Sequence, residues 1–210
     1  MTFETNKTLG GVGALLFVIG FLGFFGTGYA GLLGLIGIIL TLIALKGMAD
    51  HYSEGGIFNN ALYGVVVIII GVVIFIAALV VTAIAAFTAL GVENWTDFMM
   101  TPGNWQKLMD LNALWTFIGG VIISWVILFV FIIIATLFFR KSLNMLSAKS
   151  GEKIFETAGL LWLIGAILTI ILVGFIIILI AWILIAVGFF SIKTTVAQPP
   201  VAAQPPQPPT

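Results

Sequence analysis

The sequence predicts an all-α protein, a polytopic bundle of six transmembrane helices. Only 8% of its residues are charged and 61% are hydrophobic, whereas soluble domains carry about 25% and about 45–50%. The four longest apolar runs also contain no Asp, Glu, Lys or Arg, and they cover residues 8–45, 55–92, 111–139 and 157–192. A soluble chain of 210 residues cannot bury so much apolar surface, so lipid must act as the solvent.

The first and last apolar runs are too long for one crossing each. A crossing takes about 20 residues, and the 38 residues of the first run would form a helix of about 57 Å. The glycine-rich break between Gly26 and Gly31 predicts helices at 8–26 and 30–47. A weaker break at Val173 and Gly174 predicts helices at 155–172 and 175–192. One strongly tilted helix over this last stretch is the alternative.

The two middle runs predict longer single helices at 61–90 and 112–139, which should tilt or project beyond the bilayer. The domain of 1–192 is therefore a short hairpin, two longer helices and a second short hairpin. Residues 193–210 contain six of the seven prolines and predict a disordered, Pro-rich tail. The tail is interpreted as a spacer or as the ligand of a polyproline-binding partner.

The basic residues predict the orientation. With six spans, seven of the eight bases fall on the side of the termini, namely Lys7, Lys46, Arg140, Lys141, Lys149, Lys153 and Lys193. The positive-inside rule then places both termini in the cytoplasm of a multi-pass cell-membrane protein. The four bases between 140 and 153 should meet anionic lipid headgroups.

Two patterns bear on helix packing. Residues 13–20 (GALLFVIG) and 158–165 (AGLLWLIG) have residues of similar type at each position. This similarity indicates a parallel repeat of the two hairpins, or else only the similar composition of apolar segments. Small residues recur along four helices and predict packing faces within the chain, or a seam for a homo-oligomer or partner subunit. These residues are Gly13, Gly20, Gly23, Gly26, Gly31, Gly34, Gly37, Ala78, Thr82, Ala86, Thr116, Gly120 and Ser124.

Polar residues outside the runs give weak site signals. Asp50, His51 and Glu54 are interpreted as a solvated loop, with a metal or proton site as the alternative. The segment 91–111, with Trp95 and Trp105, is interpreted as an interfacial helix, or else as a lid or docking surface. No catalytic, cofactor-binding or metal-binding residue is assigned, and no cofactor is expected.

Several stretches resemble one family of prokaryotic, mainly archaeal, membrane proteins. They are NKTLGGVGA at 6–14, GIFNNALY at 56–63 and AGLLWLIGAILTIILVGF at 158–175. They are similar to the family called domain of unknown function 996, over about residues 5–192. The resemblance implies an integral membrane protein and carries no activity or catalytic residue.

The function expected from the residues is that of a non-enzymatic scaffold or an accessory subunit of a membrane complex. The partners expected are the lipid bilayer and either further copies of the chain or other subunits, while the zero net charge gives no reason to expect nucleic acid. A small channel or carrier for neutral or apolar solutes is the alternative, with Thr82, Thr116 and Ser124 lining its path. An enzyme is not expected, because the apolar runs contain no acid or base that could act with a nucleophile.

Overall fold

The computed structural model describes residues 2–27, 31–91, 96, 100, 111–171 and 173–193, and all regular structure in these ranges is helical. Six helices within them are long and apolar enough to cross a membrane. They are α1 (Phe3–Thr27), α2 (Gly31–His51), α3 (Gly55–Ala89), α6 (Leu111–Ser150), α7 (Ile154–Leu168, continued by the 3-10 turn Thr169–Ile171) and α8 (Val173–Ser191). The prediction of an all-α, six-helix membrane bundle is confirmed.

The two long helices extend further than predicted at the end of the bundle where the termini and seven of the eight bases lie, which we call the base-bearing end. Helix α6 was expected to stop at 139 but continues to Ser150, and α3 begins at Gly55 rather than at 61. Charged residues mark where lipid ends, whereas the helices end where the backbone turns, at Ser53 (φ 51°) and Gly151 (φ 78°). The last hairpin consists of two helices, because α7 and its 3-10 turn end at Ile171 and α8 begins at Val173 and packs back on α7, so it is not one tilted helix. The tail beyond 193 and nearly all of 92–110 lie outside the described residues.

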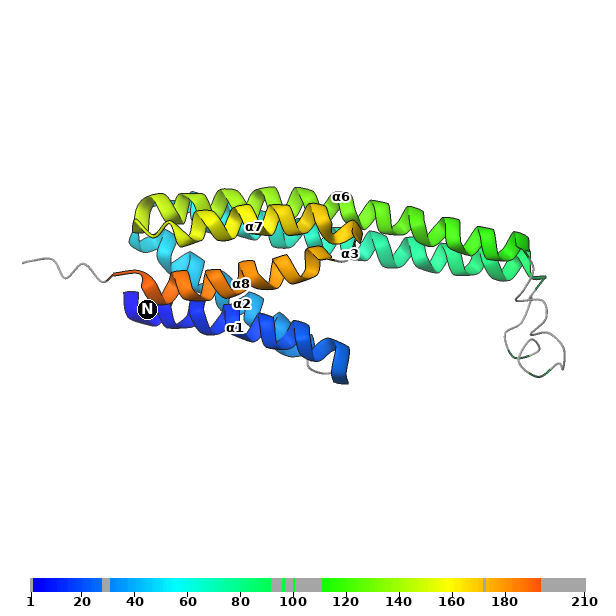
Figure 1. Ribbon diagram of the computed structural model, residues 1–210, viewed down its shortest axis with the longest axis horizontal. Coiled ribbons are helices and arrows are strands. Elements are labelled where there is room, and N and C mark those ends of the chain that lie inside the picture. The colour runs from blue at the N-terminus through cyan, green and yellow to red at the C-terminus, as the bar shows by residue number, and fades with distance from the viewer. Residues whose placement is uncertain are drawn as a thin grey trace, which may run out of the picture.

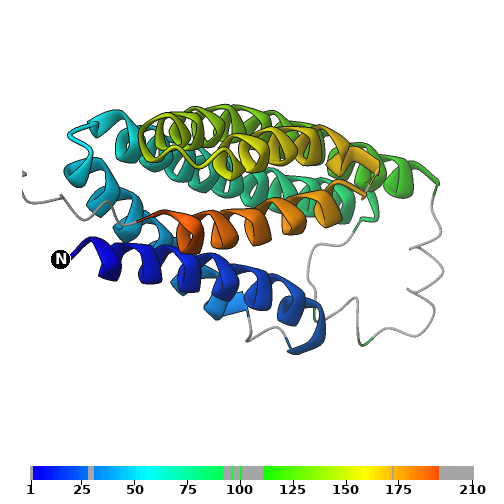
Figure 2. The ribbon, with the colours of Figure 1, turned by 60° about the vertical axis from the view of Figure 1, so that its left-hand side comes forward.

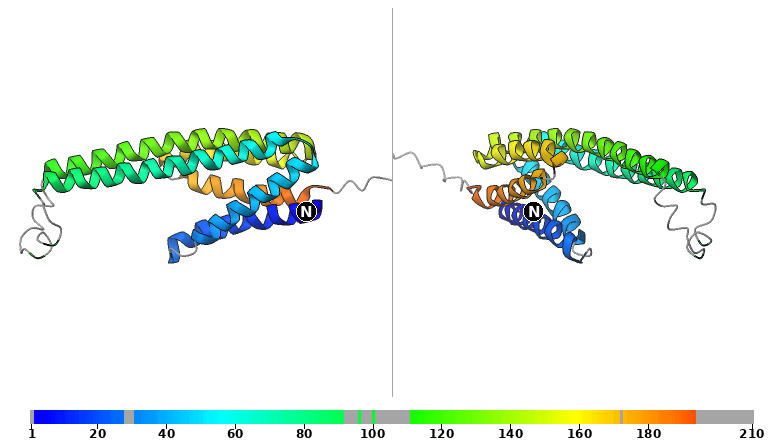
Figure 3. Two further views of the ribbon diagram at one scale, coloured as in Figure 1. Left: turned by 180° about the vertical axis from the view of Figure 1, so that it is seen from behind. Right: turned by 45° about the vertical axis from the view of Figure 1, so that its right-hand side comes forward.

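The helices pack in a closed ring in which each one contacts chiefly its two neighbours, in the order α1, α2, α3, α6, α7 and α8. Helices α3, α6 and α7 form one layer, and α1, α2 and α8 form the other (Figure 1). The start of α1 and the end of α8 lie at the same end of the bundle (Figures 1 and 2). At the opposite end, α3 and α6 project well beyond the other helices (Figure 3).

The hydrophobic core lies toward the base-bearing end. It joins Ala14 and Val18 of α1 to residues from the other five helices, among them Met48, Ile57 and Phe155, all of which are buried. The buried core residues of α3 end at Ala61 and those of α6 begin at Leu143, with Phe139 of α6 partly buried against them. Beyond those points α3 and α6 pack mainly on each other, through contacts such as Gly71 on Phe131.

Each short hairpin is closed by a contact between two glycines. In the α1–α2 hairpin, a Cβ on Gly20 would collide with the backbone of Gly34. In the α7–α8 hairpin, a Cβ on Gly174 would collide with the carbonyl oxygen of Gly165. Since lipid does not drive helices together by the hydrophobic effect, close backbone approach of this kind is what holds such hairpins.

A row of aromatic rings connects the two hairpins to α6. Trp182 of α8 is buried and stacks on Phe17 of α1 with ring centroids 4.0 Å apart. Its other neighbour is Trp162 of α7 at 5.0 Å, which in turn stacks on Phe139 of α6 at 4.4 Å. Phe17 and Trp162 occupy the same position in the two matched segments, as do Gly20 and Gly165. The matched positions therefore perform the same packing task in both hairpins.

The small-residue faces predicted on α3 and α6 are largely used within the chain. Thr82 lies against Gly120, and Ala86 and Ser124 are also buried. Thr116 was expected on the same face, but it is exposed, because residues spaced by four drift around a helix by about 40° per step. Nearer the base-bearing end, Ser142 of α6 donates a hydrogen bond of 2.5 Å to the carbonyl oxygen of Ile57 in α3.

We expect Gly20→Ala to lower the stability of the solubilised protein by about 1–3 kcal/mol, because the new methyl group must push α2 away from α1. The matched control is Gly119→Ala, because a Cβ there meets nothing within 4 Å. The control should be neutral or slightly stabilising. Thermal unfolding in detergent, followed by circular dichroism, measures both variants, and equal effects would contradict the packing account.

We expect Ser142→Ala to cost about 0.5–1.5 kcal/mol, because it removes a buried hydrogen bond between α6 and α3. Ser124 is equally buried in α6, but it donates to the carbonyl of Gly120 in its own helix. Ser124→Ala should therefore have a much smaller effect. Chemical unfolding of the two variants under the same conditions makes the comparison, and a larger loss for Ser124→Ala would refute it.

Candidate functional site

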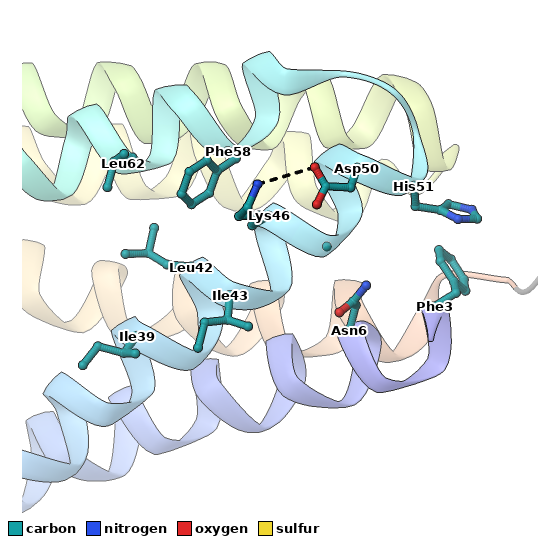
Figure 4. Close-up of a pocket in the computed structure, with 11 residues that line it drawn as sticks. Phe3, Asn6, Ile39, Leu42, Ile43, Lys46, Asp50, His51, Phe58 and Leu62 are labelled. Carbon is teal, nitrogen blue, oxygen red and sulfur yellow. Dashed lines mark ion pairs between the residues drawn. The ribbon is translucent and has the colours of Figure 1, made fainter. Parts of the chain in front are cut away.

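A cavity with polar lining lies at the base-bearing end, where α2 faces α1 on one side and α3 on the other (Figure 4). We call it the interfacial groove. Its volume is about 590 Å³, within the range of about 300–1,000 Å³ that small-molecule sites occupy. It is lined by Phe3, Asn6, Ile39, Leu42, Ile43, Lys46, Gly47, Asp50, His51, Phe58 and Leu62.

The groove has a charged end and an apolar end because α2 presents one face to it. Successive turns of α2 place Ile39, Ile43, Lys46 and Asp50 along the groove, from apolar to charged. Ile39 and Ile43 are exposed within a stretch that has no charged residue between 8 and 45. The apolar end therefore lies at the depth of lipid chains, and the charged end lies where the bases of the helix ends gather.

The charged end is held by one ion pair and two ring contacts. Lys46 Nζ lies 3.6 Å from Asp50 Oδ1, and the ammonium group also lies 5.3 Å from the centre of the Phe58 ring. His51 packs its ring against Phe3 of α1, with centroids 4.3 Å apart. The groove thus offers a cation, a carboxylate and an imidazole at one end.

Asn6 is the buried polar residue of the groove. Its side chain extends from α1 toward α2 (Figure 4), and the residue is only 3% exposed. The two helices meet closely there, because a Cβ on Gly47 would collide with the Asn6 amide. Nevertheless, Asn6 Oδ1 is buried with no hydrogen-bond partner among the described residues. Sequence reasoning missed Asn6, because an asparagine in a polar N-terminal segment normally indicates solvated chain.

The predicted cluster of Asp50, His51 and Glu54 does not converge. Asp50 pairs with Lys46, His51 packs on Phe3, and Glu54 turns to Lys149 of α6 at 3.5 Å. In the described part of the chain, no three His, Asp or Glu side chains come together in a way that would hold a metal. Burial raises the pKa of the neighbouring Tyr52 hydroxyl above its ordinary value.

A second candidate surface is the extension, which we define as residues 71–89 of α3 and 111–131 of α6. None of these residues belongs to the hydrophobic core. Seven large apolar side chains of its α3 part and eight of its α6 part are exposed. At its tip a small apolar cavity of about 290 Å³ lies between the two helices. The extension therefore exposes a long, almost purely apolar surface.

Comparison with known proteins places the chain in a family. The model of the family described as "Protein of unknown function (DUF996)" matches residues 33–183. The chain belongs to this family. An uncharacterized protein of Methanocaldococcus jannaschii is 31% identical over 193 residues, which cover 91% of this chain and 94% of the relative. No solved structure matches. The family resemblance seen in the sequence is thus confirmed. The six apolar helices agree with the integral membrane protein that this resemblance implies.

We expect Lys46→Met to change the free energy of unfolding by less than about 1 kcal/mol. The reason is exposure: the Lys46 and Asp50 side chains are 59% and 69% exposed, so solvent screens their attraction. Chemical unfolding in detergent tests this, with Asp50→Asn as the companion variant. A decrease in the free energy of unfolding above about 2 kcal/mol would mean that the ion pair stabilises the fold substantially.

Proposed function

We propose that the protein is a non-enzymatic scaffold or accessory subunit of a complex in the cell membrane, and that the extension binds helices of another integral membrane protein. The observation that carries the proposal is the long apolar helix pair that the other described helices leave uncovered (Figures 1 and 3). Both termini face the cytoplasm in this proposal, which agrees with the distribution of the bases.

The length of the extension supports a protein partner. Helices α2 and α8 have 21 and 19 residues, or about 32 and 28 Å, which match a hydrocarbon layer of about 30 Å. The charge-free part of α6, residues 111–139, spans about 43 Å, and still about 41 Å at an average tilt of about 20°. About 10 Å of apolar helix pair therefore exceeds the layer, and a partner would cover it.

The lipid-facing side of α6 also has the chemistry of a helix contact. Gly119 faces open space, and the exposed Thr116 lies on the same side of the helix. Large aliphatic side chains such as Ile123 flank them on the same face. Glycine permits close approach of a neighbouring helix and a hydroxyl can bond to it, which are the two main means by which membrane helices associate.

The hydroxyl groups of α3 and α6 give little support to the alternative of a transport path. Ser124 is buried and donates to the Gly120 carbonyl, and Thr82 packs against Gly120. The exposed Thr116 lies away from this contact. These three hydroxyl groups were the expected lining of a carrier for neutral solutes. Thr82 and Ser124 are instead buried between α3 and α6, while Thr116 is exposed, so the three do not share one path.

Site-specific photo-crosslinking in the membranes of the native cells tests the proposal. A photoreactive amino acid at Ile123 of the extension should give an adduct of one discrete mass with another integral membrane protein. Ile176 of α8 is the matched control, since both side chains are 62% exposed. The control position should give no such protein adduct.

Gly119→Trp provides the second arm, because a bulky side chain should block close approach of a partner helix and abolish the Ile123 adduct. The absence of an adduct at Ile123 would overturn the proposal, and so would equal adducts at Ile123 and Ile176. An adduct of twice the chain's own mass would show that the extension binds a second copy of this chain, and would overturn the proposal of a different partner subunit.

A further inference from the structure

We infer that the interfacial groove binds one phospholipid whose headgroup carries a hydrogen-bond donor beside its phosphate. The groove brings together a buried, unpartnered acceptor on Asn6, a cation on Lys46 and an apolar channel along Ile39 and Ile43. This inference does not depend on the proposed role of the extension, which lies at the other end of the molecule (Figure 1).

The order of the lining residues fits an amphipathic molecule lying along α2. The acyl chain lies against Ile39, Leu42 and Ile43, at a depth where the sequence has no charge. The phosphate lies at the charged end, where Lys46 can turn toward it because its ammonium group is exposed. A water-soluble ligand would gain no favourable contact from the apolar half of the groove, where Ile39 and Ile43 are exposed.

Asn6 specifies the headgroup. Its Oδ1 atom can only accept a hydrogen bond, and leaving a buried acceptor unpaired is costly. In the described ranges, the other buried side-chain atoms without a hydrogen-bond partner are Asn144 Oδ1 and Trp182 Nε1, and neither residue lines the groove. A headgroup ammonium or hydroxyl can donate to Asn6 Oδ1, whereas a quaternary ammonium has no hydrogen to donate.

Lipid binding to the full detergent-purified chain, followed by native mass spectrometry, tests this inference. The probes are phosphatidylethanolamine, which has donor hydrogens, and phosphatidylcholine of the same chains, which has none. The first should bind about tenfold more tightly, as one charge-assisted hydrogen bond predicts. Asn6→Leu should bring the ratio close to one, while the matched control Asn144→Leu should leave it unchanged.

Two further variants keep the test decisive if Asn6→Leu does not fold. Ile43→Trp should fill the apolar half and weaken both lipids while preserving their ratio, and Lys46→Met should also weaken both, because each carries a phosphate. Equal affinity of the unaltered protein for the two lipids would overturn the inference. So would a loss of preference in Asn144→Leu equal to that in Asn6→Leu, or displacement of the lipid by equimolar free phosphoethanolamine.

Discussion

Close backbone contact at glycine is the constraint on which the rest of this structure depends. Helices without charges gain nothing from leaving lipid for one another, so their association relies on how closely they pack. In this chain Gly20 meets Gly34 and Gly165 meets Gly174, and each contact closes one short hairpin. Helices α1 and α2 also approach closely where Gly47 lies against the side-chain amide of Asn6, and this contact helps to bury Asn6. The interfacial groove is thus a consequence of hairpin packing.

The aromatic row supplies what the glycine contacts cannot, namely a connection between the hairpins. Trp182 lies between Phe17 of the first hairpin and Trp162 of the second, and Trp162 continues the row to Phe139 of α6. Ring stacking adds about 0.5–1.5 kcal/mol per pair to the area that it buries. The buried Trp182 N–H has no hydrogen-bond partner among the described residues, so packing outweighs an unmade hydrogen bond there. Phe17 and Trp162 hold matched positions in the sequence, which gives the weak repeat a structural meaning.

The sequence was enough to predict the membrane-spanning helices, because lipid sets their length and composition. It was not enough to predict helix ends and side-chain contacts, because these depend on the geometry of packing. Charge-free runs and the lengths that cross a bilayer were enough for six helices, and the glycine break gave the first hairpin. The course of α6 from Arg140 to Ser150 was missed, because charge indicates where lipid ends and not where a helix ends. In the sequence, Asp50, His51 and Glu54 lie close together. In the structure each contacts a different residue: Asp50 pairs with Lys46, His51 packs on Phe3, and Glu54 pairs with Lys149. Asn6 could not be found, because its burial depends on Gly47, which is distant in sequence.

The unequal packing of the two ends explains why they suit different tasks. At the base-bearing end all six helices contribute to one core, and α3 and α6 are joined by Ser142 donating to Ile57 and by Asn60 donating to Met145 Sδ. Such packing fixes the walls of a groove well enough to recognise a small ligand. In the extension, the two helices contact through Gly71 on Phe131 and Gly120 on Thr82, and no third helix contributes to the core there. Sparse packing favours local opening, and a partner helix would supply the missing contacts.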